Sequence, residues 1–218
     1  MTRLPCPVTI AGMDALLSRP GLDPGVRALL LMQVAIARGS WEDAAKWMRA
    51  ARDLEVRRPA IEEALLQGVL FCGFPRAVSA FECLQEVWPP PATPQGGGLP
   101  PEAHESAGRE LFAKVYGSAA PQVLARLRAY HGEFHDFVLQ AAYGRILARP
   151  GLSLLLRELL AVAALVALGH QVPQLVAHGR GAVRAGASPV ELREALFTAL
   201  RDEEAAAAIL RRIEGVGP

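Results

Sequence analysis

Long apolar stretches alternate along the chain with glycine and proline, and this pattern predicts a series of helices. The segment from Val26 to Gly39, VRALLLMQVAIARG, is almost wholly apolar and ends on a glycine, as helices often do. Ser40 follows at once, with Asp43 three residues later, which is typical of the start of a new helix. Because the connection is so short, we expect the two helices to form an antiparallel hairpin.

Proline and glycine also delimit two more helices in the first half. RRPAIEEALLQGVLFCG has Pro59 near its start and Gly73 at its end, and FPRAVSAFECLQEVW begins again around Pro75. The first half therefore predicts about five helices. Hydrophobic residues make up 51% of the sequence but aromatic residues only 6%, a balance that favours packed helices over a sheet. We expect an all-α protein.

One fifteen-residue phrase occurs twice. LLSRPGLDPGVRALL begins at Leu16 and returns as ILARPGLSLLLRELL at Ile146, and the offset stays constant as far as Gly169. One extra residue follows in the second copy. Further on, VRAGASPVELREAL places Ser188 and Glu191 at the spacing of a capping box. The sequence therefore predicts a duplicated helical hairpin.

Prolines and glycines are concentrated between the two copies, in WPPPATPQGGGLPP. Proline excludes helix and glycine adds flexibility, so this composition is typical of a linker. We predict a first repeat over residues 1–90, a linker over 91–101 and a second repeat over 102–218.

These segments resemble the carboxymuconolactone decarboxylase family, which includes the alkylhydroperoxidase D-like (AhpD-like) proteins. The resemblance rests on YGRILARPGLSLLLRELLAVAALVALG and VRAGASPVELREAL in the second half, and on RRPAIEEALLQGVLFCGFPRAVSAF in the first. It implies an AhpD-like helical bundle made of two tandem repeats. It also implies a tight cyclic homo-oligomer, for which a two-repeat chain favours a homotrimer.

Peroxidase members of that family use a CxxC motif. Here the first cysteine position falls on Ser40 in the first repeat and on His170 in the second, and neither residue can form a disulfide. We therefore do not expect thiol peroxidase activity of the peroxiredoxin type. The cysteines lie elsewhere, at positions 6, 72 and 83, and Cys72 is expected to be a small buried apolar residue.

The second hairpin carries groups that can move a proton. If it folds about Gly169, Glu158 and His178 stand at similar heights, offset by about 3 Å along the helices. A carboxylate that orients an imidazole makes a proton-transfer unit for neutral pH. The resemblance implies the same two positions, provided that the turn absorbs the extra residue. The first repeat has Ala28 and Trp47 instead, so only the second hairpin retains acid/base groups.

Two functions stay open. In the first, the chain is a thiol-independent acid/base decarboxylase or lactone-processing lyase acting on a small carboxylated molecule. His178 carries the proton, Glu158 orients it and His170 is a second acid, while Arg157 and Arg180 bind the substrate carboxylate. In the second, the chain is a non-catalytic scaffold or binding protein. Its Glu158 then pairs with an arginine such as Arg180, His178 satisfies a buried hydrogen bond, and the arginines form helix-end or subunit ion pairs.

The remaining features exclude other classes of function. The net charge is +1 and the basic residues are dispersed, so nucleic acid is not an expected partner. The apolar stretch LLAVAALVAL from Leu159 is too short to span a bilayer, and no secretory signal is recognisable, so we expect a cytoplasmic protein without membrane contact. His131 and His135, with Asp136 beside them, resemble half a metal site but lack a third ligand. We expect them on a solvent-exposed helix face, and we predict no metal and no cofactor.

Overall fold

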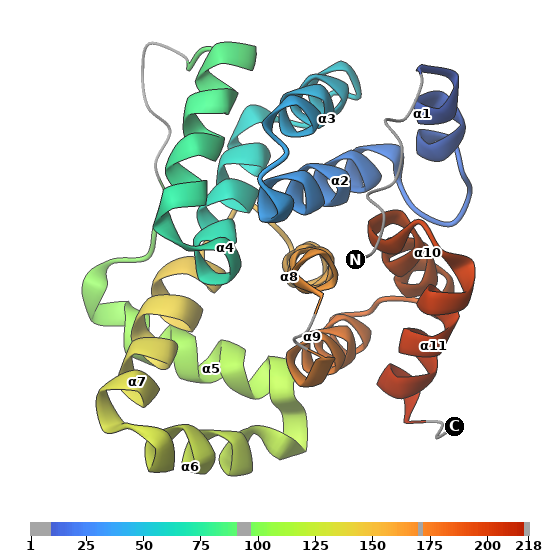
Figure 1. Cartoon of the computed structure of the whole chain (residues 1–218). Coiled ribbons are helices and arrows are strands. Elements are labelled where there is room, and N and C mark those ends of the chain that lie inside the picture. Colours follow the sequence, from blue (N-terminus) through green and yellow to red (C-terminus); the bar gives the residue numbers. More distant parts are fainter. Residues whose placement is uncertain (1–9, 91–96, 170–171, 216–218) are drawn as a thin grey trace.

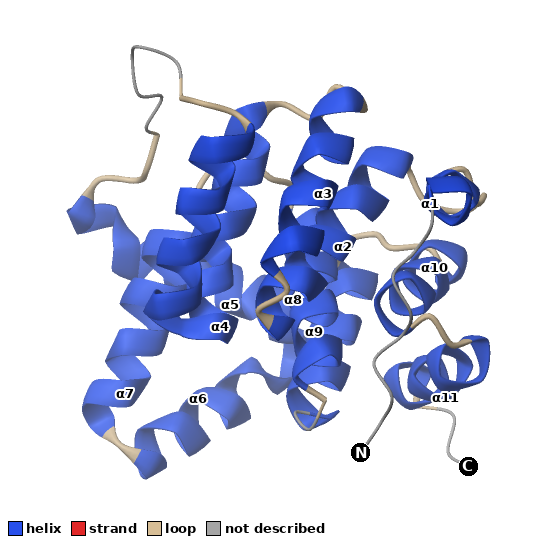
Figure 2. Cartoon of the chain, turned by 45° about the horizontal axis from the view of Figure 1, so that its top comes forward, coloured by secondary structure: helices blue, strands red, loops and turns tan. Residues whose placement is uncertain are grey.

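The computed structural model describes residues 10–90, 97–169 and 172–215, and every regular element in these ranges is a helix (Figure 2). The prediction of an all-α protein is confirmed. The first half contains α1 (Ile10–Leu17), α2 (Pro24–Arg38), α3 (Trp41–Asp53) and α4 (Arg58–Val87). The second half contains η1 (Pro101–Ala103), α5 (His104–Tyr116), η2 (Gly117–Ala119), α6 (Ala120–Tyr130), α7 (Gly132–Phe137), the π-helix η3 (Val138–Leu147), α8 (Leu154–Leu168), α9 (Val172–Arg184), α10 (Pro189–Leu200) and α11 (Glu203–Glu214).

The duplicated phrase forms two equivalent helices, α2 and α8. The Asp23 side chain caps the start of α2 and the Ser153 side chain caps the start of α8. Gly39 and Gly169 end the two helices in the left-handed conformation, with φ of 73° and 85°, which glycine adopts without steric cost. Each helix packs against the helix that follows it, α3 or α9, as predicted. Figure 1 shows α8 in the middle of the molecule, between α2, α4 and α9.

Of two predicted helix starts, one differs in detail from the observed one. Ser40 lies at the start of α3, but its hydroxyl donates to the Asp43 carboxylate (2.9 Å) and does not cap the backbone. Ser188 and Glu191 do form the predicted capping box at the start of α10. The Ser188 hydroxyl accepts from a backbone N–H, whereas the Ser40 hydroxyl donates to a side chain.

Helix α4 combines the two helices expected on either side of Gly73. Its backbone leaves helical geometry at this glycine (φ 76°, ψ 170°), so the predicted break appears as a kink. Within the described ranges, α4 is the one helix long and apolar enough to cross a membrane, a property that core helices of soluble proteins share.

The two repeats share one hydrophobic core. Leu30 and Met32 of α2 and Leu160 and Val162 of α8 are buried in the same cluster. A second, smaller cluster lies where α5 packs on η3. The repeats are therefore joined through packing as well as through the linker.

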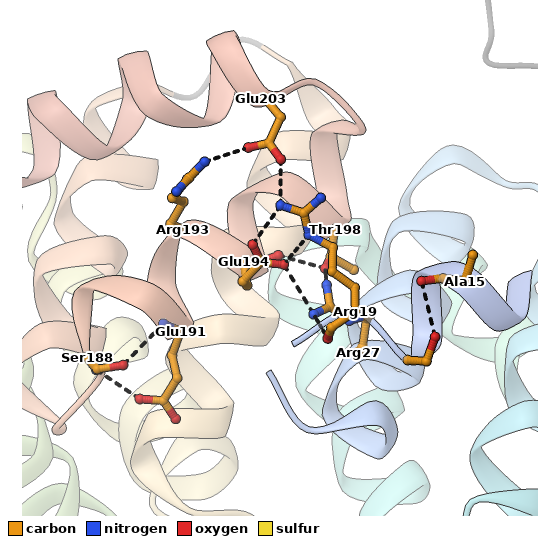
Figure 3. Close-up of polar contacts among 10 residues, drawn as sticks. Ala15, Arg19, Arg27, Ser188, Glu191, Arg193, Glu194, Thr198 and Glu203 are labelled. Carbon is orange, nitrogen blue, oxygen red and sulfur yellow. Dashed lines mark hydrogen bonds and ion pairs between the residues drawn. The ribbon is translucent and has the colours of Figure 1, made fainter. Parts of the chain in front are cut away.

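Arg27 of α2 joins the first repeat to the end of the second. Its side chain is fully buried and donates to Thr198 Oγ1 (2.5 Å) and Glu194 Oε2 (3.2 Å), both in α10 (Figure 3). The nitrogen that donates to Glu194, Nη2, also donates to the Arg19 carbonyl (2.9 Å), and Arg19 forms a second ion pair with Glu194 (2.6 Å). One glutamate thus serves two arginines of the other repeat.

Arg157 of α8 makes the equivalent contacts from the second repeat to the first. It donates to Glu63 Oε2 (2.9 Å) and Gln67 Oε1 (3.2 Å) of α4 and to the Arg149 carbonyl (2.9 Å). Arg149 also pairs with Glu63 (2.8 Å). Because Arg157 and Arg149 stand 130 residues after Arg27 and Arg19, the two arginine clusters are equivalent and related by exchange of the repeats.

Helix α5 and the π-helix η3 approach each other through two glycines. A Cβ atom on Gly108 would lie 2.0 Å from the Leu139 carbonyl oxygen, and one on Gly144 would lie 1.9 Å from that of His104. Only glycine permits such close packing of the two backbones. This contact fixes α5 beside the second hairpin.

Candidate functional site

The predicted contact between Glu158 and His178 is present. Glu158 lies on α8 and His178 on α9, and 2.9 Å separate Glu158 Oε2 from His178 Nδ1. Glu158 is 1% exposed, and the His178 side chain is 12% exposed. A carboxylate only accepts hydrogen bonds, so Nδ1 carries the proton, and Nε2 of the neutral ring is the nitrogen with a free lone pair. This geometry suits a base or acid that acts through Nε2.

A glycine on α9 makes room for the buried carboxylate. A Cβ atom on Gly181 would lie 2.3 Å from Glu158 Oε2 and 3.2 Å from Val115 Cγ1 of α5. Two helices and the carboxylate therefore meet at this glycine. The GRG sequence around it gives no local sign of this role.

One aromatic side chain contacts the pair, and two tyrosines interact with its charge. The Phe71 ring of α4 meets the His178 ring edge to face, with 5.6 Å between centroids. Burial raises the pKa values of Tyr116 and Tyr143, and the charge of Glu158 raises both further. Sequence reasoning missed all three residues, because Phe71 comes from the other repeat and Tyr116 lies where the family resemblance is weakest.

The two candidate substrate-binding arginines are held by other parts of the protein. Arg157 is 1% exposed and is bonded to Glu63 and Gln67. Arg180 follows His178 by two residues, which places it on a different face of α9, and it donates to the Ile213 (3.0 Å) and Arg212 carbonyls. These contacts hold both arginines within the fold. The hydrogen-bond partner of Glu158 is His178. The third candidate acid, His170, lies outside the described residues.

The first repeat has no comparable polar pair. Ala28 is fully buried and Trp47 is 5% exposed, and both belong to the shared core. Apolar side chains therefore occupy the positions that correspond to Glu158 and His178.

The prediction that His131 and His135 share an exposed helix face is wrong. His131 has an extended backbone (φ −170°) between α6 and α7, and His135 is buried, with its Nδ1 2.7 Å from Asp136 Oδ1. The chain turns at His131, the residue that precedes α7, and His135 lies on the buried side of that helix. Within the described ranges, no group of three or more His, Cys, Asp or Glu side chains is placed to hold a metal ion.

Cys72 is half-buried and accepts a long hydrogen bond from Gln33 Nε2 (3.8 Å). Burial raises the pKa of its thiol, which keeps the sulfur protonated and weakly nucleophilic near neutral pH. The geometry gives no support to a thiol mechanism at this position.

Comparison with known proteins agrees with this architecture. The model of the carboxymuconolactone decarboxylase family matches residues 9–86 and 132–211, one match in each predicted repeat. A 4-carboxymuconolactone decarboxylase of Acinetobacter baylyi is 30% identical over 97 residues, which cover 44% of this chain and 72% of that protein. The Peroxisomal protein 2 of Schizosaccharomyces pombe is 30% identical over 146 residues, which cover 65% of this chain and 68% of that protein.

The two matched regions contain the two hairpins, and the second contains Glu158 and His178. The chain therefore belongs to the carboxymuconolactone decarboxylase family and has an AhpD-like helical fold built from two tandem repeats.

Proposed function

We propose that this protein is a thiol-independent acid/base decarboxylase that acts on a small lactone carrying a carboxylate. The observation that supports this most directly is the buried pair of Glu158 and His178 on the second hairpin. The name of the Acinetobacter relative suggests the class of substrate.

His178 supplies the proton in this reaction. The bond between the ring carbon and the carboxylate breaks and carbon dioxide leaves. The electron pair moves through the conjugated double bond onto the lactone carbonyl oxygen. The imidazolium of His178 then delivers a proton from Nε2 to carbon, and Glu158, bonded to Nδ1, stabilises the charged ring and fixes its orientation. No metal or cofactor is required for these steps. His170 stays the candidate for a second acid.

Arg157 and Arg180 have a smaller part in this proposal than the sequence suggested. To bind a substrate carboxylate, Arg157 would have to leave Glu63 and Gln67, and a buried ion pair is costly to open. We assign both arginines to the structure of the protein.

The test is decarboxylation of 4-carboxymuconolactone by the purified protein, and the release of carbon dioxide measures its rate. His178→Gln should lower kcat by about 10²- to 10⁴-fold, the range for loss of a general acid or base. His131→Gln is the matched control, because His131 is exposed and outside the site. A wild-type protein without lyase activity would overturn the proposal.

The alternative, a non-catalytic scaffold, is favoured by the apolar filling of the first hairpin at Ala28 and Trp47. If the protein is such a scaffold, we expect no turnover and the same unfolding temperature with and without the lactone. Ligand-dependent stabilisation that disappears in His178→Gln would argue against it.

A further inference from the structure

The stretch between the two family-matched regions, residues 87–131, brings a helix to the candidate site. This helix, α5, ends at Gly117, whose backbone (φ 57°, ψ −134°) is one that other residues rarely adopt. Arg184 of α9 donates to the Val115 carbonyl (2.7 Å). The end of α5 is therefore tied to the helix that carries His178.

The same end of α5 lies beside the Glu158 carboxylate. The Val115 side chain is 1% exposed, and it meets Gly181 of α9 at the point where Glu158 Oε2 also lies. The next residue along α5 is Tyr116. A helix outside the family match thus brings a phenol to the residue next to Val115, at the end of α5 that contacts the second hairpin.

Two aromatic neighbours hold the Tyr116 ring. It stacks on Phe112, with 4.3 Å between centroids, and lies 6.3 Å from the Tyr143 ring at a tilt of 47°. Phe112 also contacts Tyr143 (4.7 Å). Phe112 and Tyr143 are both buried, so their contacts restrict the movement of the Tyr116 ring.

Burial is the main cause that shifts the pKa of both phenols. Burial raises the pKa of Tyr116, the interaction with Tyr143 lowers it, and the charge of Glu158 raises it. For Tyr143, burial is again the main cause of a raised pKa, and the interaction with Tyr116 raises it further. Both pKa values are raised, so both phenols stay neutral at physiological pH and each carries an O–H that can donate.

We propose that Tyr116, held by Tyr143, donates a hydrogen bond to the carbonyl oxygen of a lactone bound beside Glu158 and His178. The identity of the ligand in this inference rests on the proposed function. The carbonyl oxygen becomes enolate-like when carbon dioxide leaves, so a donor placed there stabilises the transition state more than the ground state. The nearby negative charge of Glu158 opposes an enolate, and a neutral donor offsets that effect.

The placement of Tyr116 can be tested without any substrate. The chain has three tyrosines, and the third, Tyr130, is exposed. Tyrosine labelled with ¹³C at the ring carbon that bears the hydroxyl gives one resonance per residue, assigned by single Tyr→Phe variants. Glu158→Gln should lower the pKa of Tyr116 and of Tyr143. A Tyr116 titration that does not respond to Glu158→Gln overturns the inference.

The role of Tyr116 is tested by kinetics on 4-carboxymuconolactone. Tyr116→Phe should lower kcat by about 100-fold, as loss of one oxyanion donor does, with KM changed by no more than about threefold. Tyr143→Phe should give a smaller loss, because Tyr143 only positions Tyr116, and Tyr130→Phe should match the wild type.

The possible outcomes separate the two proposals. An active wild type with unchanged kcat in Tyr116→Phe overturns this inference and leaves the decarboxylase standing. An inactive wild type overturns the decarboxylase and this inference together. Thermal unfolding of each variant shows whether a loss of rate reflects a loss of fold, and the titration with Glu158→Gln, in which every tyrosine is retained, remains decisive if Tyr116→Phe unfolds.

Discussion

Arg27 and Arg157 occupy equivalent positions in the two repeats, and each forms its ion pair with the other repeat. Arg27 bonds to Glu194 and Arg157 bonds to Glu63, so a buried arginine of each hairpin is neutralised across the boundary. Both arginine side chains are almost completely buried. The two repeats are therefore bound to each other by paired charges as well as by apolar packing.

Removing the negative partner should destabilise the protein strongly. Glu194→Gln leaves the buried Arg27 without a counter-charge, so we expect the free energy of unfolding in urea to fall by about 3–5 kcal/mol. Glu203→Gln is the matched control, because Glu203 also pairs with Arg19 but is 43% exposed. This control should cost less than about 1 kcal/mol. Equal losses in the two variants would show that burial of the Arg27 pair contributes nothing.

The same glutamate should make stability depend on pH. The hydrogen bond from Arg19 is the main reason why the pKa of Glu194 lies below its ordinary value of 4.5, and burial opposes it. A lowered pKa in the folded state means that the stabilisation is complete above pH 4.5 and is lost as the pH falls through the folded-state pKa. The free energy of unfolding, measured from about pH 6 to about pH 3, should therefore fall less steeply in Glu194→Gln than in the wild type. Parallel curves would contradict this.

Gly181 should be essential for the geometry of the site. In Gly181→Ala the added methyl group would overlap the Glu158 carboxylate, so we expect the contact with His178 to be lost. Lyase activity should fall to the level of Glu158→Gln. Gly132→Ala is the control, because a Cβ atom there meets no other atom within 4 Å. Full activity of Gly181→Ala would mean that the carboxylate does not orient His178.

Cys72 should behave as an unreactive thiol. Because burial raises its pKa, alkylation by iodoacetamide should be slow near pH 7 and should accelerate only at pH values above the usual range for cysteine. Site-resolved mass spectrometry measures this rate. We also expect no hydroperoxide turnover with a dithiol donor. Rapid alkylation at neutral pH, or peroxidase activity that Cys72→Ser abolishes, would refute this assignment.

Local sequence signals predicted the parts of the fold that depend on neighbouring residues. The left-handed glycines Gly39 and Gly169 and the antiparallel contact between Glu158 and His178 all follow from spacing within one hairpin. The partners of Arg157 could not be predicted in this way, because Glu63 lies 94 residues away on the other repeat. His135 shows the opposite difficulty: its spacing from His131 suggested a shared exposed face, but the chain turns at His131 and the His135 ring is buried.

The shared core predicts that neither repeat is stable alone. Helices α2 and α8 bury their apolar faces against each other, and each repeat supplies the counter-charge for the other's arginine. Fragments 1–90 and 102–218, produced separately, should therefore lack a cooperative thermal transition by circular dichroism. Mixed or expressed together, they should associate and recover one, because the linker contributes none of these contacts. Glu63→Gln combined with Glu194→Gln should prevent this recovery, since the ion pairs of both buried arginines, Arg27 and Arg157, are then removed. A cooperative transition in either fragment alone would show that each repeat has an independent core.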